Sequence, residues 1–334
     1  MSHAKFLTRC LQLANYAKGS TAPNPMVGAV IVYNGEIIGE GYHHKAGEPH
    51  AEVMAINSVK DPSLLVSSTL YCSLEPCAHY GKTPPCSLLI TNNRIPRVVI
   101  GCSDSNELVN GKGVEHLQSH GVEVLFSEDP TPFRQLTQVF FCNKEHKRPF
   151  VTLKWAQSQD RYLDRARTID EQASSISGPL AAVKSHQLRS VVDGILISAK
   201  TLNWDRPSLS TRNYHGTNPR AIILINKTMP DVYALDNLST APLFVGNVSE
   251  LEGDKIICDP YEIKQWLPEL LDYGIHHLLV EGGGRVLQSF IDTGVVDQWH
   301  RFSSTDSIND GIPAPKLDAR HTTHNLAADR YDRS

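Results

Sequence analysis

The chain lacks several features that would set it apart from ordinary globular proteins. Its formal net charge is only −4 over 334 residues, so it carries no basic excess of the kind that binds nucleic acid. No apolar run approaches the roughly 18 residues of a membrane span, and the first residues lead into an amphipathic pattern instead of a signal peptide. The sequence has neither internal repeats nor low-complexity tracts. These absences exclude a transmembrane protein and disfavour a nucleic-acid-binding one.

Cysteine occurs seven times, an odd number, which speaks against a framework of disulfides. Two cysteines belong to a motif that suits a metal. We expect the other five to be reduced and mostly buried, as in a cytoplasmic protein: Cys10, Cys72, Cys102, Cys142 and Cys258. The length favours about two domains.

The residues His50, Glu52, Cys77 and Cys86 suit a catalytic zinc. Zinc takes nitrogen and sulfur ligands tetrahedrally, and a catalytic site keeps the fourth position for water. We therefore expect His50, Cys77 and Cys86 to bind Zn²⁺, and Glu52 to shuttle a proton. The pattern H-x-E followed by P-C is the signature of zinc-dependent base deaminases. In this chain, however, eight residues separate the two cysteines, where the common signature has two.

A structural zinc module is the alternative interpretation of this motif. Such a site closes with a fourth protein ligand. Here that ligand could only be His43, His44 or His79, and we expect His79 to be a substrate contact or a surface residue instead.

Alternating strands and helices predict an α/β protein with one domain over residues 1–147 and another over residues 148–334. In the first domain the pattern predicts strands at 27–32, 69–74, 98–102 and 122–126, helices at 51–59, 86–93 and 113–120, and a connecting helix at 133–147. In the second it predicts strands at 150–155, 194–198, 221–225, 243–245 and 277–280, and helices at 180–191, 261–273 and 285–293. The polar segment 327–334 predicts no closing strand, as in a domain shortened at its C-terminus.

The segment 73–86, SLEPCAHYGKTPPC, resembles the deaminase half of the bifunctional riboflavin biosynthesis deaminase/reductase family, in which the longer loop between the cysteines is the rule. The segments PNPMVG (23–28), GEGYH (39–43) and AGEPH (46–50) are similar to that family as well. The resemblance implies a cytidine-deaminase-like three-layer domain followed by a dihydrofolate-reductase-like α/β domain. It also implies a pyrimidine substrate that carries a ribose phosphate.

Three residues of the first domain would then contact substrate. The resemblance implies that Asn24 reads the edge of the pyrimidine ring, although asparagine before proline is also an ordinary turn. Lys82 and Thr83 are candidates for the phosphate, the alternative being a plain surface loop.

The second domain resembles the reductase half of the family. The similar segments are LKWAQSQD (153–160), the run from Thr201 to Arg212, and VEGG (280–283). The resemblance implies that four residues surround the ribose phosphate of the substrate: Arg189, Leu209, Arg212 and Glu281. It implies contacts with NADPH for seven others: Lys154, Gln157, Thr201, Asp205, Gly282, Gly283 and Gly284. A glycine turn at the start of a helix suits cofactor phosphates.

Departures from the family pattern leave alternatives open. Arg161 stands where glycine is usual and is expected to crowd a turn, Arg206 replaces an acid or amide, and residues 168–177 match loosely. A chain that only deaminates, with a non-catalytic second domain serving oligomerisation, is one alternative, and a nucleoside or tRNA deaminase is another. We expect a cytoplasmic, homo-oligomeric enzyme that deaminates 2,5-diamino-6-ribosylamino-4(3H)-pyrimidinone 5′-phosphate with Zn²⁺ and then reduces the ribosyl group to ribityl with NADPH.

Overall fold

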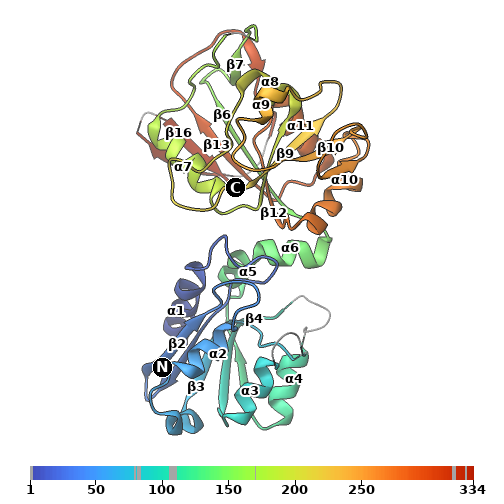
Figure 1. The fold of residues 1–334 in the computed structure, drawn as a ribbon. Coiled ribbons are helices and arrows are strands. Elements are labelled where there is room, and N and C mark those ends of the chain that lie inside the picture. The colour runs from blue at the N-terminus through green and yellow to red at the C-terminus, as the bar shows by residue number, and fades with distance from the viewer. Residues whose placement is uncertain are drawn as a thin grey trace. The chain divides into compact units, whose positions relative to one another are not determined.

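Two separate sheets organise the chain, one in each of two units, Met1–Lys147 and Arg148–Ser334 (Figure 1). The structure is a computed structural model that describes residues 3–78, 80, 84–104, 111–169, 171–317, 321–327 and 329–334. His79, Lys82 and Thr83 lie outside the described residues. Among those described, no helix has the length and apolar run needed to cross a membrane.

The first unit is built on a five-stranded sheet in the order β2-β1-β3-β4-β5, in which β1 runs antiparallel to β2 and β3 while β3, β4 and β5 are parallel. Its strands are β1 (Gly28–Tyr33), β2 (Glu36–Tyr42), β3 (Thr69–Leu74), β4 (Arg97–Cys102) and β5 (Glu123–Phe126). Its helices are α1 (Ala4–Asn15), α2 (Ala51–Asn57), the 3₁₀ helix η1 (Pro62–Ser67), α3 (Cys86–Asn92), α4 (Lys112–Ser119), α5 (Thr131–Leu136) and α6 (Gln138–His146).

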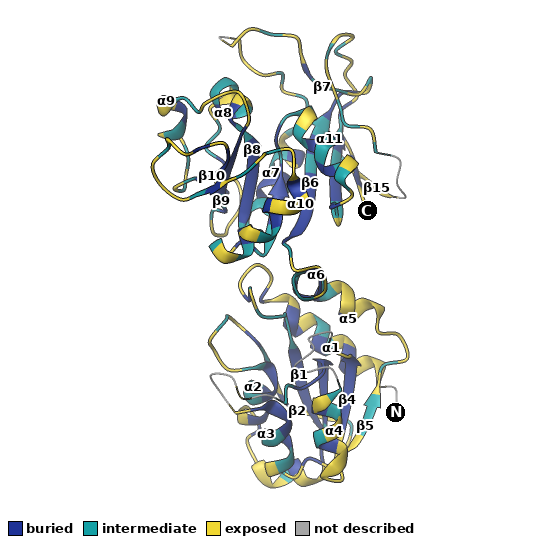
Figure 2. Cartoon of the chain, turned by 90° about the vertical axis from the view of Figure 1, so that its right-hand side faces the viewer, coloured by how far each residue is buried: buried dark blue, intermediate teal, exposed yellow. Residues whose placement is uncertain are grey.

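Both faces of this sheet are buried, because successive residues of a strand point to opposite sides. In β1, Ala29 and Ile31 pack with α2, α3 and α4, whereas Val30 and Val32 pack with α1, α5 and α6. The central strands are accordingly buried along most of their length (Figure 2). The expected three-layer arrangement is confirmed.

The second unit contains a nine-stranded sheet in the order β11-β10-β9-β8-β12-β6-β13-β16-β15, and a separate ribbon of β7 and β14. The strands are β6 (Phe150–Gln157), β7 (Tyr162–Arg165), β8 (Gly194–Ser198), β9 (Arg220–Ile225), β10 (Leu243–Gly246), β11 (Lys255–Ile257), β12 (His277–Val280), β13 (Gln298–Ser303), β14 (Gly311–Pro313), β15 (Thr322–Leu326) and β16 (Asp329–Arg333). The helices are α7 (Pro179–Arg189), α8 (Ala199–Asp205), α9 (Val232–Leu235), α10 (Ile263–Trp266), the 3₁₀ helix η2 (Leu267–Tyr273) and α11 (Gly284–Thr293).

The strands from β11 to β13 are parallel, and their apolar residues feed two cores. Leu196 and Val280 pack with α10, η2 and α11 on one face. Ile195 and Ile197 pack with α8 and α9 on the other. An α/β fold with helices on both faces of a mainly parallel sheet is confirmed for this unit.

The expectation that the polar C-terminal segment forms no strand is wrong. β16 pairs antiparallel with β13, and β15 pairs with β16. Tyr331 stacks on Phe302 with ring centroids 5.0 Å apart. Asp332 is completely buried and accepts hydrogen bonds from Arg301 and Arg330. Partners on β13 therefore stabilise a strand whose own composition is polar.

Arg161 occupies a turn whose backbone favours glycine, as expected, but its side chain does not crowd that turn. It adopts a left-handed backbone conformation with φ of 67°, and its side chain is exposed, so the bulk of the arginine points to solvent. Arg206 is likewise left-handed and exposed, where it ends α8. The two departures from the family pattern therefore fall on turn positions at the surface.

Two predicted helices are each divided in the structure. The connecting helix at 133–147 is two helices, α5 and α6, that meet at Thr137. The helix predicted at 261–273 is a short α10 followed by the 3₁₀ helix η2, with Pro268 at the start of the latter. Proline has no N–H to donate to the preceding turn, which explains the change.

Candidate active sites

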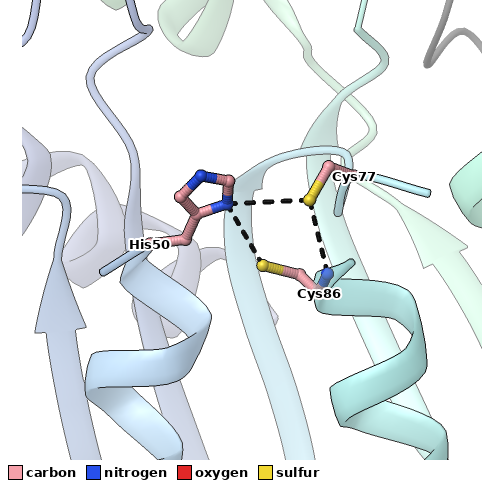
Figure 3. A group of neighbouring side chains, drawn as sticks. All are labelled: His50, Cys77 and Cys86. Carbon is pink, nitrogen blue, oxygen red and sulfur yellow. Dashed lines mark hydrogen bonds between the residues drawn. The ribbon is translucent and has the colours of Figure 1, made fainter. Parts of the chain in front are cut away.

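Three metal-ligand side chains meet at the edge of the first sheet where β3 ends. Nδ1 of His50 lies 3.6 Å from Sγ of Cys77 and 3.3 Å from Sγ of Cys86 (Figure 3). His50 immediately precedes α2, Cys77 follows β3, and Cys86 is the first residue of α3. The backbone N–H of Cys86 donates to Sγ of Cys77 over 3.3 Å, which ties the two cysteines together.

This donor set fits zinc. All three ligand atoms lie within 4.8 Å of one another. Zinc–sulfur and zinc–nitrogen bonds of about 2.0–2.3 Å place the ligands of a tetrahedral site about 3.5 Å apart. The observed separations match that spacing. One imidazole and two thiolates would supply three protein ligands, the number that catalytic zinc sites have.

The electrostatics of the cluster favour a thiolate. Hydrogen bonding from Cys86, with a further contribution from His50, lowers the pKa of Cys77 to about 4. The contact with Cys77 in turn raises the pKa of His50 to about 9. A deprotonated thiol is the form that binds a metal.

Glu52 lies in the first turn of α2, two residues after His50, and only 4% of it is exposed. Burial raises the pKa of its carboxyl group, and the neighbouring Cys77 acts in the same direction. A buried carboxyl group whose pKa is raised from its ordinary value is suited to accept and return a proton. The geometry thus suits the role expected for Glu52.

Asn24 is oriented by a buried histidine. Nδ1 of His43 lies 3.0 Å from the carbonyl oxygen of Pro49 and must donate to it, because a carbonyl only accepts. The amide nitrogen of Asn24 can only donate, so Nε2 of His43 is the acceptor and the ring is neutral. Burial, which lowers the pKa of His43, favours the same form. Nε2 accepts a hydrogen bond of 3.0 Å from Nδ2 of Asn24. This contact fixes the orientation of the amide, and the predicted contact of Asn24 with substrate stays a prediction.

The same contacts test whether a histidine could be the fourth protein ligand of a structural zinc site. Both ring nitrogens of His43 are engaged, so this histidine is unsuited to bind the metal. His44 is exposed and lies 3.8 Å from Glu48. His43 was missed as a positioning residue from sequence, although it closes the GEGYH segment that signalled the family.

In the second unit a cavity of about 1430 Å³ opens at the carboxyl ends of the parallel strands β6, β8, β9 and β12. Ligands of open α/β sheets bind at such edges. Typical small-molecule pockets measure about 300–1,000 Å³, so this one has room for a cofactor and a substrate together. Seven of the predicted reductase residues line it: Lys154, Thr201, Asp205, Glu281, Gly282, Gly283 and Gly284.

The remaining predicted residues lie elsewhere around this region. Gln157 is buried and accepts a hydrogen bond from Nε1 of Trp155. Leu209 is buried in the apolar core beside α8. Arg212 is exposed and donates to Oγ of Ser208 over 2.9 Å. Contacts of these residues with cofactor or substrate stay predictions.

Glu281 is held by two cations. Arg189 donates to both of its carboxylate oxygens, over 2.9 and 2.7 Å, and Nζ of Lys154 lies 3.6 Å away. Burial alone would raise the pKa of Glu281, but Arg189 and Lys154 together lower it to about 2. The third guanidinium nitrogen of Arg189 donates to the carbonyl oxygen of Ser210. Arg189 therefore orients Glu281, and its predicted contact with phosphate stays untested.

The three glycines before and at the start of α11 permit a close approach of the backbone. A Cβ at Gly284 would lie 2.9 Å from the carbonyl oxygen of Pro313, and one at Gly282 would lie 3.2 Å from Cα of Ile197. The N–H of Gly283 donates to Oγ1 of Thr201, which draws α8 to the turn. A helix start with exposed backbone N–H groups suits the phosphates of a dinucleotide.

Comparisons with known proteins find a match for each of the two units. Residues 1–102 match the cytidine and deoxycytidylate deaminase zinc-binding region, and residues 149–304 match the RibD C-terminal domain. The riboflavin biosynthesis protein RibD of Aquifex aeolicus is 34% identical over 96% of this chain and 92% of its own length. The RibD of Bacillus amyloliquefaciens is 36% identical over 93% and 86%.

A solved structure extends this agreement to three dimensions. The diaminohydroxyphosphoribosylaminopyrimidine deaminase/5-amino-6-(5-phosphoribosylamino)uracil reductase of Thermotoga maritima has a TM-score of 0.88 and 32% identity, covering 98% of this chain and 97% of that one. The similarity therefore spans both sheets. The chain therefore belongs to the RibD family of riboflavin biosynthesis enzymes, which join a deaminase domain to a reductase domain.

Proposed function

We propose that the first unit, residues 1–147, is a zinc-dependent deaminase of 2,5-diamino-6-ribosylamino-4(3H)-pyrimidinone 5′-phosphate. The second unit, residues 148–334, then reduces the ribosyl group of the product to ribityl with NADPH. The observation that carries the proposal is the convergence of His50, Cys77 and Cys86 beside the buried Glu52. The name of the Thermotoga maritima relative supports the substrate and the pairing of the two steps.

In the deaminase unit, each residue has a defined task. A zinc ion held by His50, Cys77 and Cys86 would supply the Lewis acid that makes water nucleophilic near neutral pH. Glu52 takes one proton from the attacking water and gives it to the ring nitrogen. It then takes the second proton of that oxygen and gives it to the amine, so that a C–O bond replaces the C–N bond and ammonia leaves. Asn24 Oδ1 accepts a hydrogen bond from the ring edge, in the orientation that His43 imposes.

In the reductase unit, the nicotinamide supplies the hydride and the protein orients it against the ribose. The turn at Gly282–Gly284 and the start of α11 receive cofactor phosphate. Thr201 and Asp205 contact the remainder of the cofactor from α8. Glu281, fixed by Arg189 and Lys154, accepts hydrogen bonds from the ribose hydroxyl groups of the substrate.

Two separate readouts test this proposal. The purified protein, loaded with zinc, is incubated with the diaminopyrimidine phosphate and NADPH, and ammonia release and NADPH oxidation are followed independently. We expect both, and we expect chelation of zinc to stop ammonia release while the deaminated product still consumes NADPH. Absence of ammonia release would refute the deaminase. Ammonia release without NADPH oxidation would instead favour a non-catalytic second unit.

The compartment and the assembly state belong to the same proposal. We expect a cytoplasmic homo-oligomer, with the buried thiols of Cys10, Cys72 and Cys102 as support for a reducing compartment. Light scattering of the purified protein tests the assembly state, and a monomer at micromolar concentration would contradict it.

A further inference from the structure

Arg167 lies between two carboxylates on the wall of the reductase cavity. Its Nε donates to Oδ2 of Asp164 over 2.6 Å, and its Nη2 bonds to Oδ1 of Asp205. Its Nη1 donates to the carbonyl oxygen of Glu171 over 2.9 Å. Only 4% of the arginine side chain is exposed. All three branches of the guanidinium group are thus fixed by the protein.

This arginine joins two segments that are distant in sequence. Asp164 belongs to β7, and Asp205 is the last residue of α8. The side chain of Asp164 is itself fixed, because its Oδ1 accepts hydrogen bonds from the backbone N–H groups of Arg165 and Ser174. Arg167 is therefore a rigid link between the segment that follows β7 and the end of α8, and Asp164, Arg167 and Asp205 all line the cavity.

The ion pair with Arg167 opposes the effect of burial on the carboxyl group of Asp205. Burial raises the pKa of this carboxyl group, and the pairing with Arg167 opposes that effect. Without the arginine, the carboxylate would be partly buried beside another acid, Asp164, and would lose the cation that balances both. Such a group protonates or turns away toward solvent. The ion pair uses Oδ1 of Asp205, so Oδ2 can accept a hydrogen bond from a ligand in the cavity.

We propose that Arg167 is a positioning residue of the cofactor site, which holds the carboxylate of Asp205 turned toward the bound dinucleotide. The proposal rests on the NADPH-dependent reduction proposed for the second unit. Arg167 acts through Asp205, whose Oδ2 accepts from a hydroxyl or amide donor of the cofactor. Arg167 directly precedes the segment 168–177, where similarity to the family is loose, and no motif of the sequence singled it out.

Binding of NADPH alone tests this role without any turnover. Trp155 and Trp204 line the cavity, so quenching of tryptophan fluorescence reports occupancy. Arg167→Met removes the charge and keeps much of the apolar stem, and we expect it to weaken NADPH binding about 10-fold or more. Arg167→Lys keeps a charge without the fork and should fall between Arg167→Met and wild type. Arg165→Met is the matched control, because it makes the same change at an exposed arginine that is not among the cavity-lining residues, and we expect less than about a 3-fold change.

A double-mutant cycle shows whether Arg167 acts through Asp205. We expect Arg167→Met to add less than about 2-fold to the loss caused by Asp205→Asn, since the two changes remove one interaction. If the losses of affinity from the two single variants multiply in the double variant, Arg167 contacts the cofactor itself, which would overturn the proposal. Unchanged binding in Arg167→Met would overturn it as well. Arg167→Gln serves the same test if the methionine variant fails to fold.

Ammonia release by the same protein is the internal control, because the deaminase unit contains none of these residues. We expect it to be unchanged in every variant. Wild-type protein that binds no NADPH would refute both the proposed reductase and the role of Arg167. Normal binding by wild type together with normal binding by Arg167→Met would refute only the role of Arg167.

Discussion

Nδ2 of Asn24 donates a hydrogen bond of 3.0 Å to Nε2 of His43, and this contact decides which way the asparagine amide faces. The histidine can accept only because its Nδ1 donates to the carbonyl oxygen of Pro49. One backbone carbonyl thereby sets the ring tautomer, and the ring sets the amide. These contacts connect Asn24, which precedes β1, to the metal cluster, because the ring centroids of His43 and His50 lie 5.6 Å apart.

Replacing His43 by leucine should disturb substrate binding more than zinc binding. The variant keeps an apolar side chain in a buried position but leaves Asn24 without its acceptor. We expect KM for the diaminopyrimidine to rise about 10-fold, since a misdirected amide leaves a polar group of the substrate unpaired. Steady-state ammonia release and zinc analysis measure the two effects. His44→Leu is the control at an exposed neighbouring position, and equal KM values for the two variants would contradict the role of His43.

The ion pairs of Glu281 predict a pH dependence of stability in the second unit. The pKa of about 2 lies below the ordinary value of 4.5. A carboxyl group whose pKa is lowered by folding stabilises the folded state above pH 4.5 and loses that effect as the pH falls toward 2. We expect the free energy of unfolding to drop by about 3 kcal/mol over this window.

Tryptophan fluorescence can follow that drop, because all four tryptophans lie in the second unit: Trp155, Trp204, Trp266 and Trp299. Urea unfolding is measured at several pH values for wild type, Glu281→Gln and the exposed control Glu262→Gln. The decrease in the free energy of unfolding as the pH falls should be smaller only in Glu281→Gln. An identical slope in all three proteins would show that Glu281 carries no such linkage.

The buried Asp332 predicts that the C-terminal strand is essential to the second unit. Asp332→Ala leaves Arg301 without its anionic partner on β16. Removing one member of a buried ion pair costs about 3–5 kcal/mol. Tryptophan-monitored unfolding measures this loss, and Arg333→Ala, on the exposed side of the same strand, is the matched control. Equal stability of the two variants would mean that β16 contributes little to the sheet.

The metal cluster was predictable from sequence because its chemistry is distinctive. Few patterns other than a zinc site place His50 and Glu52 before two prolyl-cysteine pairs. The central strands were predictable for a different reason: runs such as 69–74, 194–198 and 277–280 are apolar on both faces, as strands covered on both sides must be. Their positions in the structure agree with the prediction to within a residue.

What could not be predicted depends on partners far along the chain. β16 is polar, and it forms a strand because Arg301 and Phe302 receive Asp332 and Tyr331. Arg167 looks like an ordinary surface charge until α8 brings Asp205 to it from 38 residues away. The topology of the sheet determines pairings of this kind, so they cannot be predicted from local sequence propensity.

Glu52→Gln tests the central claim most directly. Glutamine keeps the size and hydrogen-bonding capacity of the side chain but cannot take a proton from water. We expect the variant to retain zinc at the wild-type stoichiometry while ammonia release from the diaminopyrimidine phosphate falls at least about 10²–10⁴-fold. Glu48→Gln, an exposed position near His50, should release ammonia at the wild-type rate. Normal turnover by Glu52→Gln with zinc in place would contradict the account.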